Sequence, residues 1–355
     1  MKYTIAIPSY KRPDTLKNKT MNLLSKHNIE PNKIIIFVAN QQQENEYQNT
    51  LEPNTYNKLV KGKKGIKNIR NFMSKYFDEG EPIFYMDDDI SEMYQNYNHP
   101  ELRNRNTITH IDSNYNRSNN YLLPLTNLHK FILNGFQEAK KRNCDNWGVY
   151  PIENPYFMKP TSKDKDDFLS TKLNYIMGGL TGVFNNRKAE VRTLDDKEDY
   201  ERSIKYYLKD NGVLRFNNVC GRTNCYKEPG GMQVDRTYDR ILESAQYLCE
   251  KYPELCSLNM TKKSGYPEVR MKDNRNLMNN NNNNDILRLK VSKSHKRNSN
   301  NNRNNKSKKN NTGQREILNY FLKLQQPNSY IKTNENHYNN NNHNNNHNNN
   351  NKRKV

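Results

Sequence analysis

The chain has 355 residues, of which 32% are hydrophobic, and a formal net charge of +20 at pH 7. So few hydrophobic residues cannot fill a core over the whole length, so part of the chain is expected to stay unfolded. Polar residues interrupt the N-terminal apolar run, and no stretch reaches the length of a membrane span, which argues against a leader or a membrane protein and favours a soluble intracellular one.

Expected strands and helices alternate through the first 90 residues. Short apolar runs predict strands at 2–7, 33–39, 57–62 and 82–86, and helical spacing of apolar residues predicts helices at 13–27, 44–51 and 66–77. Such alternation with short connections predicts an α/β fold with a mostly parallel sheet and helices on both faces. Ligands of such sheets bind beyond the carboxyl ends of the strands.

Three consecutive carboxylates, Asp87, Asp88 and Asp89, follow the fourth expected strand. Adjacent like charges need solvation or a counter-charge, and Mg²⁺ and Mn²⁺ prefer carboxylate and phosphate oxygens. Pro8 and Ser9 end the first strand, at the same edge of the expected sheet. The cluster therefore predicts a metal-bridged phosphate site where a nucleotide would lie, with a solvated acidic turn as the alternative.

The middle of the chain continues the alternation. The polar, turn-rich residues 98–125 are interpreted as a loop beside the site, followed by a helix at 125–143 and a buried strand at 146–152. In the glycine-rich segment 172–186, Gly179 is expected to let a ligand approach the backbone, or to mark a bulge or bend.

An acidic helix start and a glycine loop complete this region. Glu198 and Asp199 open an expected helix, where a carboxylate can act as a base or can simply complement the helix dipole. Asp195 and Asp196, just before them, are interpreted as helix N-terminal charges. A flexible loop with flanking positive charge could close over phosphates or meet an acceptor, and it consists of Lys227, Gly230, Gly231 and Arg236.

Asparagine dominates from residue 272 onward, and apolar periodicity is lost. Residues 272–355 contain 17 lysines and arginines against 4 acidic residues, so about 13 of the +20 charges lie there. We therefore expect a folded domain at 1–271 and a disordered basic tail at 272–355. Such a tail suits a polyanionic partner such as nucleic acid, although expansion of asparagine codons would produce the same runs.

Four motifs in order carry a resemblance to a known family: AIPSYKRPDTL at the first strand, KGIKNIRNF before the fourth, YMDDDI at its end and DKEDYERSIKYYLKDNGVLRF later. Together they resemble a glycosyltransferase of the GT-A (Rossmann-like) fold. More narrowly, they are similar to the TET/JBP-associated glycosyltransferases. The resemblance covers about residues 2–270 and implies a nucleotide-sugar-binding fold with a mixed, mostly parallel sheet.

The resemblance implies roles for matching residues. Asp87 and Asp89 form the DxD pair that holds Mn²⁺ or Mg²⁺ against the donor diphosphate, and Asp199 is the implied general base, with Glu198 as the runner-up. The implied nucleotide-sugar site consists of Pro8, Ser9, Tyr10, Arg12, Gly65, Lys67, Arg70, Asn71, Asp87 and Asp88. Many GT-A enzymes add a late histidine ligand, which the expected folded domain of this sequence lacks, so the metal would depend on the carboxylates, the diphosphate and water.

The implied reaction is transfer of a hexose, glucose by preference, from a uridine diphosphate (UDP) sugar to a hydroxymethyl-pyrimidine in DNA. One alternative keeps the fold but has a protein or glycan acceptor. Another is a catalytically inactive adaptor for DNA or a clamp, which the intact carboxylates disfavour. The sequence leaves the sugar, the acceptor base and the stereochemical outcome open.

A short segment of the tail departs from its asparagine-rich surroundings. Gln314, Ile317, Tyr320 and Phe321 match peptides that bind the sliding clamp (proliferating cell nuclear antigen), because one helical turn places the three apolar side chains on one side. A chance match and a helix that docks back on the catalytic domain are the alternatives. With a clamp partner the protein would act in the nucleus or at the site of DNA replication.

Overall fold

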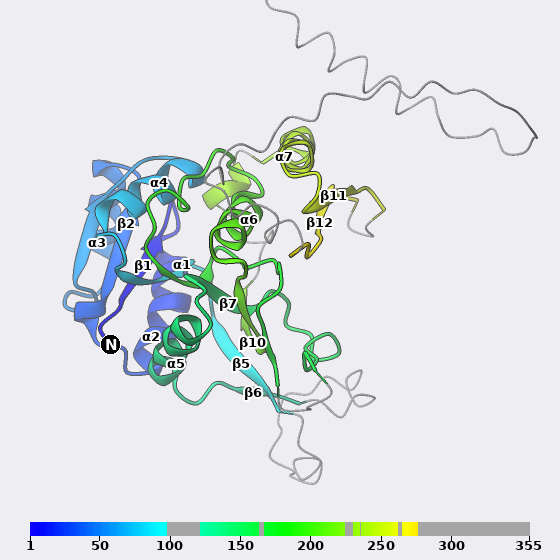
Figure 1. Ribbon diagram of the computed structural model, residues 1–355. Helices are drawn as coiled ribbons and strands as arrows, with labels where there is room; N and C mark the ends of the chain where they lie inside the picture. Colours follow the sequence, from blue (N-terminus) through cyan, green and yellow to red (C-terminus); the bar gives the residue numbers. More distant parts are fainter. Residues whose placement is uncertain (98–120, 163–166, 224–229, 235, 262–264, 276–355) are drawn as a thin grey trace, which may run out of the picture. The chain divides into compact units, whose positions relative to one another are not determined.

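The computed structural model describes residues 1–97, 121–162, 167–223, 230–234, 236–261 and 265–275 (Figure 1). The helical segments are α1 (Pro13–Leu16), η1 (Lys17–Met21), α2 (Asn22–Lys26), η2 (Pro31–Lys33), α3 (Gln41–Thr50), α4 (Ile66–Tyr76), α5 (Leu128–Lys141), α6 (Glu198–Asp210), η5 (Gly231–Val234) and α7 (Tyr238–Lys251). The strands are β1 (Thr4–Pro8), β2 (Ile34–Val38), β3 (Lys58–Lys61), β4 (Pro82–Met86), β5 (Glu92–Tyr97), β6 (Tyr121–Pro124), β7 (Asn146–Tyr150), β8 (Leu169–Ser170), β9 (Leu180–Phe184), β10 (Leu214–Arg222), β11 (Cys256–Asn259) and β12 (Glu268–Met271).

One large sheet has the order β3-β2-β1-β4-β9-β7-β10-β5-β6, with β8 paired to β10. Strands β1 to β4 are mutually parallel where they pair, β7 and β10 are also parallel, and β9 runs antiparallel between β4 and β7. Only β9, β5 and β8 oppose the common direction. The predicted α/β class with a mixed, mostly parallel sheet is therefore confirmed.

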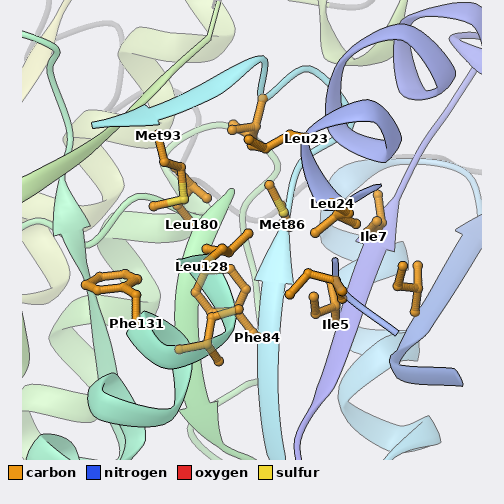
Figure 2. Packing of buried hydrophobic residues seen from close by; sticks show 14 of the residues in the cluster. Ile5, Ile7, Leu23, Leu24, Phe84, Met86, Met93, Leu128, Phe131 and Leu180 are labelled. Carbon is orange, nitrogen blue, oxygen red and sulfur yellow. The ribbon is translucent and has the colours of Figure 1, made fainter. Parts of the chain in front are cut away.

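Alternation of side chains along the strands produces two cores, one on each face of the sheet. On β4, Phe84 and Met86 belong to the core beneath α1, α2 and α5, whereas Ile83 and Tyr85 belong to the core beneath α4, α6 and α7. Figure 2 shows the first core, where Ile5 and other residues of β1 and β4 meet side chains of α2, α5, β5 and β9. The predicted helices on both faces are present.

The elements of the first 90 residues appear as predicted, with Pro13 at the start of a helical run through Lys26 that contains a π-helical turn at Lys17–Met21. The predicted loop at 98–125 is wrong at its end, because Tyr121–Pro124 forms β6 against β5. Residues 98–120 lie outside the described part of the chain. Within the described residues, no helix is long and apolar enough to cross a membrane.

Candidate active site

The three acidic residues lie at a switch point of the sheet. Strands β2 and β3 continue from β1 in one direction, while β4 pairs with the other side of β1. The connections after β1 and β4 therefore separate there, which leaves a crevice-forming edge in open α/β sheets. Ser9 and the carboxylates of Asp87 to Asp89 follow these two neighbouring strands.

Asp88 faces the α1 and α3 side of this edge. Ser9 Oγ donates a hydrogen bond to Asp88 Oδ2 (2.5 Å), and Arg12 Nη1 contacts Asp88 Oδ1 (3.2 Å). Tyr47 Oη lies 2.6 Å from Ser9 Oγ. Burial raises the pKa of Asp88 to about 7 against the opposing effects of Arg12 and Ser9. The carboxylate of Asp88 therefore connects the turn after β4 to the segment between β1 and α1.

Asp87 faces the opposite side, toward α4 and α6, as alternation along an extended chain requires. Its Oδ1 accepts a hydrogen bond from Arg70 Nη2 (2.7 Å), whose side chain is 2% exposed while that of Asp87 is 42% exposed. Asp89 is buried, and its pKa is raised by burial and then by the charge of Asp87. Asp87 is therefore paired and accessible, whereas Asp89 is buried with Arg12 Nη1 at 4.0 Å from its Oδ2.

The backbone just before β9 approaches Asp87 closely. The backbone N–H of Asp87 donates to the carbonyl of Gly179 (2.9 Å), and a Cβ atom on Gly179 would lie 2.2 Å from Asp87 Oδ2. A Cβ atom on Gly178 would lie 2.9 Å from Glu198 Oε1. The two glycines therefore leave room for the carboxylates of Asp87, which follows β4, and Glu198, at the start of α6.

A buried guanidinium fixes Glu198. Arg192 Nε donates to Glu198 Oε2 (2.7 Å), and Arg192 Nη2 contacts Glu190 Oε2 (2.9 Å). Arg70 Nε lies 3.6 Å from the other oxygen, Glu198 Oε1. Burial alone would raise the pKa of Glu198, but the guanidinium groups of Arg192, Arg70 and Arg202 outweigh it and lower that pKa. Glu198 is therefore held ionised and occupied by structural partners.

Asp199 has a different environment. Tyr175 Oη donates to its Oδ2, and the backbone N–H of Tyr200 lies 3.0 Å from its Oδ1. It makes no ion pair within the described residues, and its pKa is raised by burial and then by the charge of Glu198. A raised pKa makes a carboxylate a stronger base. Of the acidic pair, Asp199 has the chemistry of a proton acceptor and Glu198 that of a structural anion.

The remaining predicted donor residues are placed around these clusters. Gly65 precedes α4 with a φ of 93°, a conformation that favours glycine. Lys67 donates its backbone N–H to Asp195 Oδ1 (3.1 Å), and the amide of Asn71 exchanges hydrogen bonds with the backbone of Arg192 (2.9 and 2.7 Å). These contacts join α4 to the segment before α6. In the structure, Lys67 and Asn71 therefore connect these two parts of the chain.

The glycine loop contacts the segment after β1. Gly230 accepts a hydrogen bond from Arg12 Nη2 (2.9 Å), and the N–H of Gly231 donates to the carbonyl of Tyr10 (3.1 Å). Arg236 Nε donates to Asp196 Oδ1 (2.8 Å), in the segment before α6. Pro8 pairs with Phe37 at the end of β1. Lys227 and the clamp-binding segment 314–321 lie outside the described residues.

The interpretation of Asp195 and Asp196 as helix N-terminal charges is wrong. Asp196 is buried and joins Arg236 and Arg240 Nε (2.6 Å), so it links the start of α6 to α7. Asp195 links the same segment to α4 through Lys67. Sequence spacing could not reveal these pairs, because their members come together only through the tertiary fold.

A divalent cation fits the described carboxylates under one condition. No group of three or more histidine, cysteine or acidic residues that could hold a metal occurs among the described residues. Mg²⁺ and similar ions, however, commonly use one or two carboxylates together with substrate phosphates and water. The accessible Asp87 and the neighbouring Asp89, whose pKa is raised, offer two carboxylates of this kind. This donor set fits an ion that a diphosphate helps to bind.

Comparisons with known proteins give only distant similarity. No model of a known protein family matches the chain, and no curated protein matches its sequence. The crystal structure of S. aureus TarS 1-349 in complex with UDP aligns with 62% of this chain and 59% of its own, at 13% identity and a TM-score of 0.36. Mannosyltransferase PcManGT from Pyrobaculum calidifontis, in complex with GDP-Man and Mn²⁺, aligns with 60% of this chain and 53% of its own, at 11% identity and a TM-score of 0.36. The chain thus spans less than two thirds of the length of either of these structures.

Proposed function

We propose that the protein is a glycosyltransferase that moves a hexose from a nucleotide-sugar to an acceptor hydroxyl. The observation that carries this proposal is that two kinds of carboxylate lie at one edge of the sheet: the acidic residues that follow β4, and a residue at the start of α6 whose pKa is raised. Asp87 and Asp89 follow β4 at the switch point of the sheet, where ligands of open α/β sheets bind, and Asp199, with its raised pKa, lies at the start of α6. A phosphate site beside a base is what glycosyl transfer requires.

The side chains have distinct tasks in this reaction. Asp199 accepts the proton of the acceptor hydroxyl while that oxygen attacks the anomeric carbon and the bond to the diphosphate breaks. Glu198, held by Arg192, keeps the start of α6 in position. A divalent cation bound by Asp87 and Asp89 would supply neutralisation of the charge on the leaving diphosphate. Attack from the side opposite the leaving group would invert the anomeric centre.

The donor and acceptor are proposed at a finer level. We propose a UDP-sugar, with UDP-glucose as the first donor to test, and a hydroxymethyl-pyrimidine in DNA as the acceptor. The motif resemblance and the basic net charge of +20 support a nucleic acid acceptor. A protein or glycan acceptor and an inactive adaptor are the competing possibilities, and they differ in measurable ways.

Mass spectrometry separates these possibilities. The full chain is incubated with Mn²⁺, a panel of nucleotide-sugars and hydroxymethylated DNA, and the nucleosides are then analysed. A hexose-shifted nucleoside supports the proposal, whereas donor hydrolysis without nucleoside modification points to another acceptor. Absence of both binding and hydrolysis of every donor contradicts enzymatic activity. Asp199→Asn should lower transfer by about 10²-fold or more while donor binding persists, and Asp78→Asn, at an exposed position, is the matched control.

The tail peptide is a separate proposal about partners. Residues 314–321 lie outside the described part of the chain, so the clamp match depends on the sequence alone. We propose that a synthetic peptide spanning residues 308–326 binds a sliding clamp, and that replacing Tyr320 and Phe321 with alanine abolishes binding. Calorimetry with the cognate clamp tests this, and no detectable heat with the unmodified peptide contradicts it.

A further inference from the structure

One partly buried cation on the active-site face of the sheet has no acidic partner among the described residues. Arg215 is the second residue of β10, and its Nε donates to Oδ1 of Asn217 (2.8 Å). Its guanidinium carbon lies 5.0 Å from the ring centroid of Tyr150. By contrast, the buried Arg70 and Arg192 each contact carboxylates. Among the described residues, the groups that contact the Arg215 side chain are therefore neutral.

This arrangement is energetically incomplete without an anion. Burial lowers the pKa of Arg215 to about 10, so the side chain stays charged at neutral pH although it has lost part of its hydration. An amide oxygen and an aromatic face replace only part of that hydration, since an unpaired charge removed from water is costly. A guanidinium presents its donors as a planar fork that matches the oxygens of phosphate.

The strand registers locate Arg215 relative to the carboxylates. Tyr85 pairs with Thr181, Thr181 with Gly148, and Gly148 with Arg215. Laterally paired residues share a face of the sheet, so Arg215 lies on the face of Tyr85, beneath α4 and α6. Three strand spacings place it about 14 Å from Tyr85, which precedes Asp87 by two residues.

The side chain also points toward the edge where the site lies. Arg215 is in register with Gly148, yet its guanidinium lies over Tyr150, two residues nearer the carboxyl end of β7. The β7–β10 register shifts between Phe216 and Cys220 directly afterwards, so the ladder is irregular here. Such irregularities re-aim side chains and are frequent beside active sites.

We propose that Arg215 binds a backbone phosphate of a nucleic acid acceptor, on a platform formed by Tyr150 and Asn217. This inference rests on the proposed transferase and extends it, because it names an acceptor-binding group on the active-site face. The donor diphosphate would bind beyond β1 and β4, while the acceptor would approach the carboxyl ends of β7 and β10, toward which the Arg215 guanidinium points; Asp199 lies at the start of α6 on the same face. Arg215 thereby acts as an acceptor-binding residue and takes no part in proton transfer.

The test compares Arg215→Gln and Arg215→Lys with Arg142→Gln, which removes an arginine paired to Glu138 on the other face of the sheet. Binding of a labelled single-stranded oligonucleotide containing 5-hydroxymethylcytosine is measured by fluorescence anisotropy over a range of potassium chloride concentrations. The full chain is used, so the tail contributes equally to every variant. Calorimetry with UDP and Mn²⁺ reports the donor site independently.

Loss of one phosphate contact should weaken oligonucleotide binding about tenfold for Arg215→Gln and reduce the salt slope by about 0.7, with a smaller effect for Arg215→Lys. The thermal midpoint of Arg215→Gln should stay unchanged or rise, because an unpaired cation is removed. UDP binding should be unaffected, as should all properties of Arg142→Gln.

Three outcomes would overturn the inference. The first is an unchanged affinity and salt slope in Arg215→Gln, and the second is a clear fall in its thermal midpoint, which would indicate a structural role. The third is a wild-type chain that binds UDP but not the oligonucleotide, which leaves the transferase standing and removes the nucleic acid. Conversely, oligonucleotide binding through Arg215 without UDP binding would contradict the proposed function and retain the phosphate site.

Discussion

Asp89 is buried beside the charge of Asp87, with Arg12 Nη1 4.0 Å from its Oδ2, so its replacement should separate stability from function. Burial and the neighbouring charge raise its pKa, which means that its ionised form is disfavoured in the protein without metal. Asp89→Asn should therefore leave the thermal midpoint unchanged or slightly higher. It should also abolish the stabilisation by Mn²⁺ with UDP and lower transfer by about 10²-fold or more, since a catalytic metal contributes several kcal/mol.

Differential scanning fluorimetry with and without Mn²⁺ and UDP, together with a transfer assay, checks this prediction. The exposed Asp78→Asn is the control for loss of a surface carboxylate. Full transfer by Asp89→Asn, or full transfer by the unmodified protein in chelator, would remove the metal from the mechanism.

The hydroxyl of Tyr175 donates a hydrogen bond to Asp199. Its hydrogen bond stabilises the ionised carboxylate, so it opposes the rise in pKa that burial and Glu198 cause. Tyr175→Phe removes this bond and should raise the pKa of Asp199 further. A base works only when ionised, so the acidic limb of the pH profile of kcat/KM should move to higher pH.

The neighbouring Tyr200→Phe provides the control, because the Tyr200 ring lies 4.3 Å from that of Tyr175 while its hydroxyl contacts Glu268. Its acidic limb should stay with that of the wild type. A Tyr175→Phe limb that stays in place or moves to lower pH would show that Asp199 is not the titrating base.

At the scale of elements, α4, α6 and the segment before α6 are joined by buried charges. Arg192 contacts Glu190 and Glu198, and its backbone exchanges hydrogen bonds with Asn71 of α4. Removing one member of a buried ion pair leaves the other charge unpaired, which typically costs about 3–5 kcal/mol. Arg192→Leu should therefore lower the free energy of unfolding by about that amount.

Urea denaturation measures this loss against Arg187→Leu, which removes a half-exposed arginine 3.8 Å from the exposed Asp78. The control should lose about 1 kcal/mol or less. Equal losses in the two variants would mean that the buried network contributes no more than a surface pair.

The same elements show how far sequence reasoning reaches. The strand and helix periods of the first 90 residues, and the carboxylates at the end of β4, are local signals, and the structure has them as predicted. Arg192, Tyr175 and Arg215 carried no local signal, because their importance depends on neighbours from other elements. Similarly, β5 and β6 were missed because the sequences EMYQNY and YLLP lack a clear apolar alternation.

At the scale of the whole molecule, the folded domain was expected to end at residue 271, but the residues that follow, up to residue 275, still contact the domain. The N–H of Lys272 donates to the carbonyl of Leu255 (2.7 Å), and Asp273 Oδ1 accepts a hydrogen bond from the backbone N–H of Leu173 (3.1 Å). Arg275 Nη2 lies 3.4 Å from Thr171 Oγ1. We infer that these residues belong to the domain and hold the loop that leads to Tyr175.

A chain that ends at residue 271 should therefore be less stable than one that ends at residue 275. Leu173 is buried, so loss of the Asp273 acceptor leaves its N–H without a partner, which costs about 1–3 kcal/mol. The loop that begins at Thr171 also carries Tyr175, so transfer by the shorter chain should fall along with its stability. Asp273→Ala in the full-length protein should reproduce most of both losses, since it removes the same acceptor without shortening the chain. Urea denaturation and the transfer assay measure the effects, and equal stability of the two shortened chains would return the boundary to residue 271.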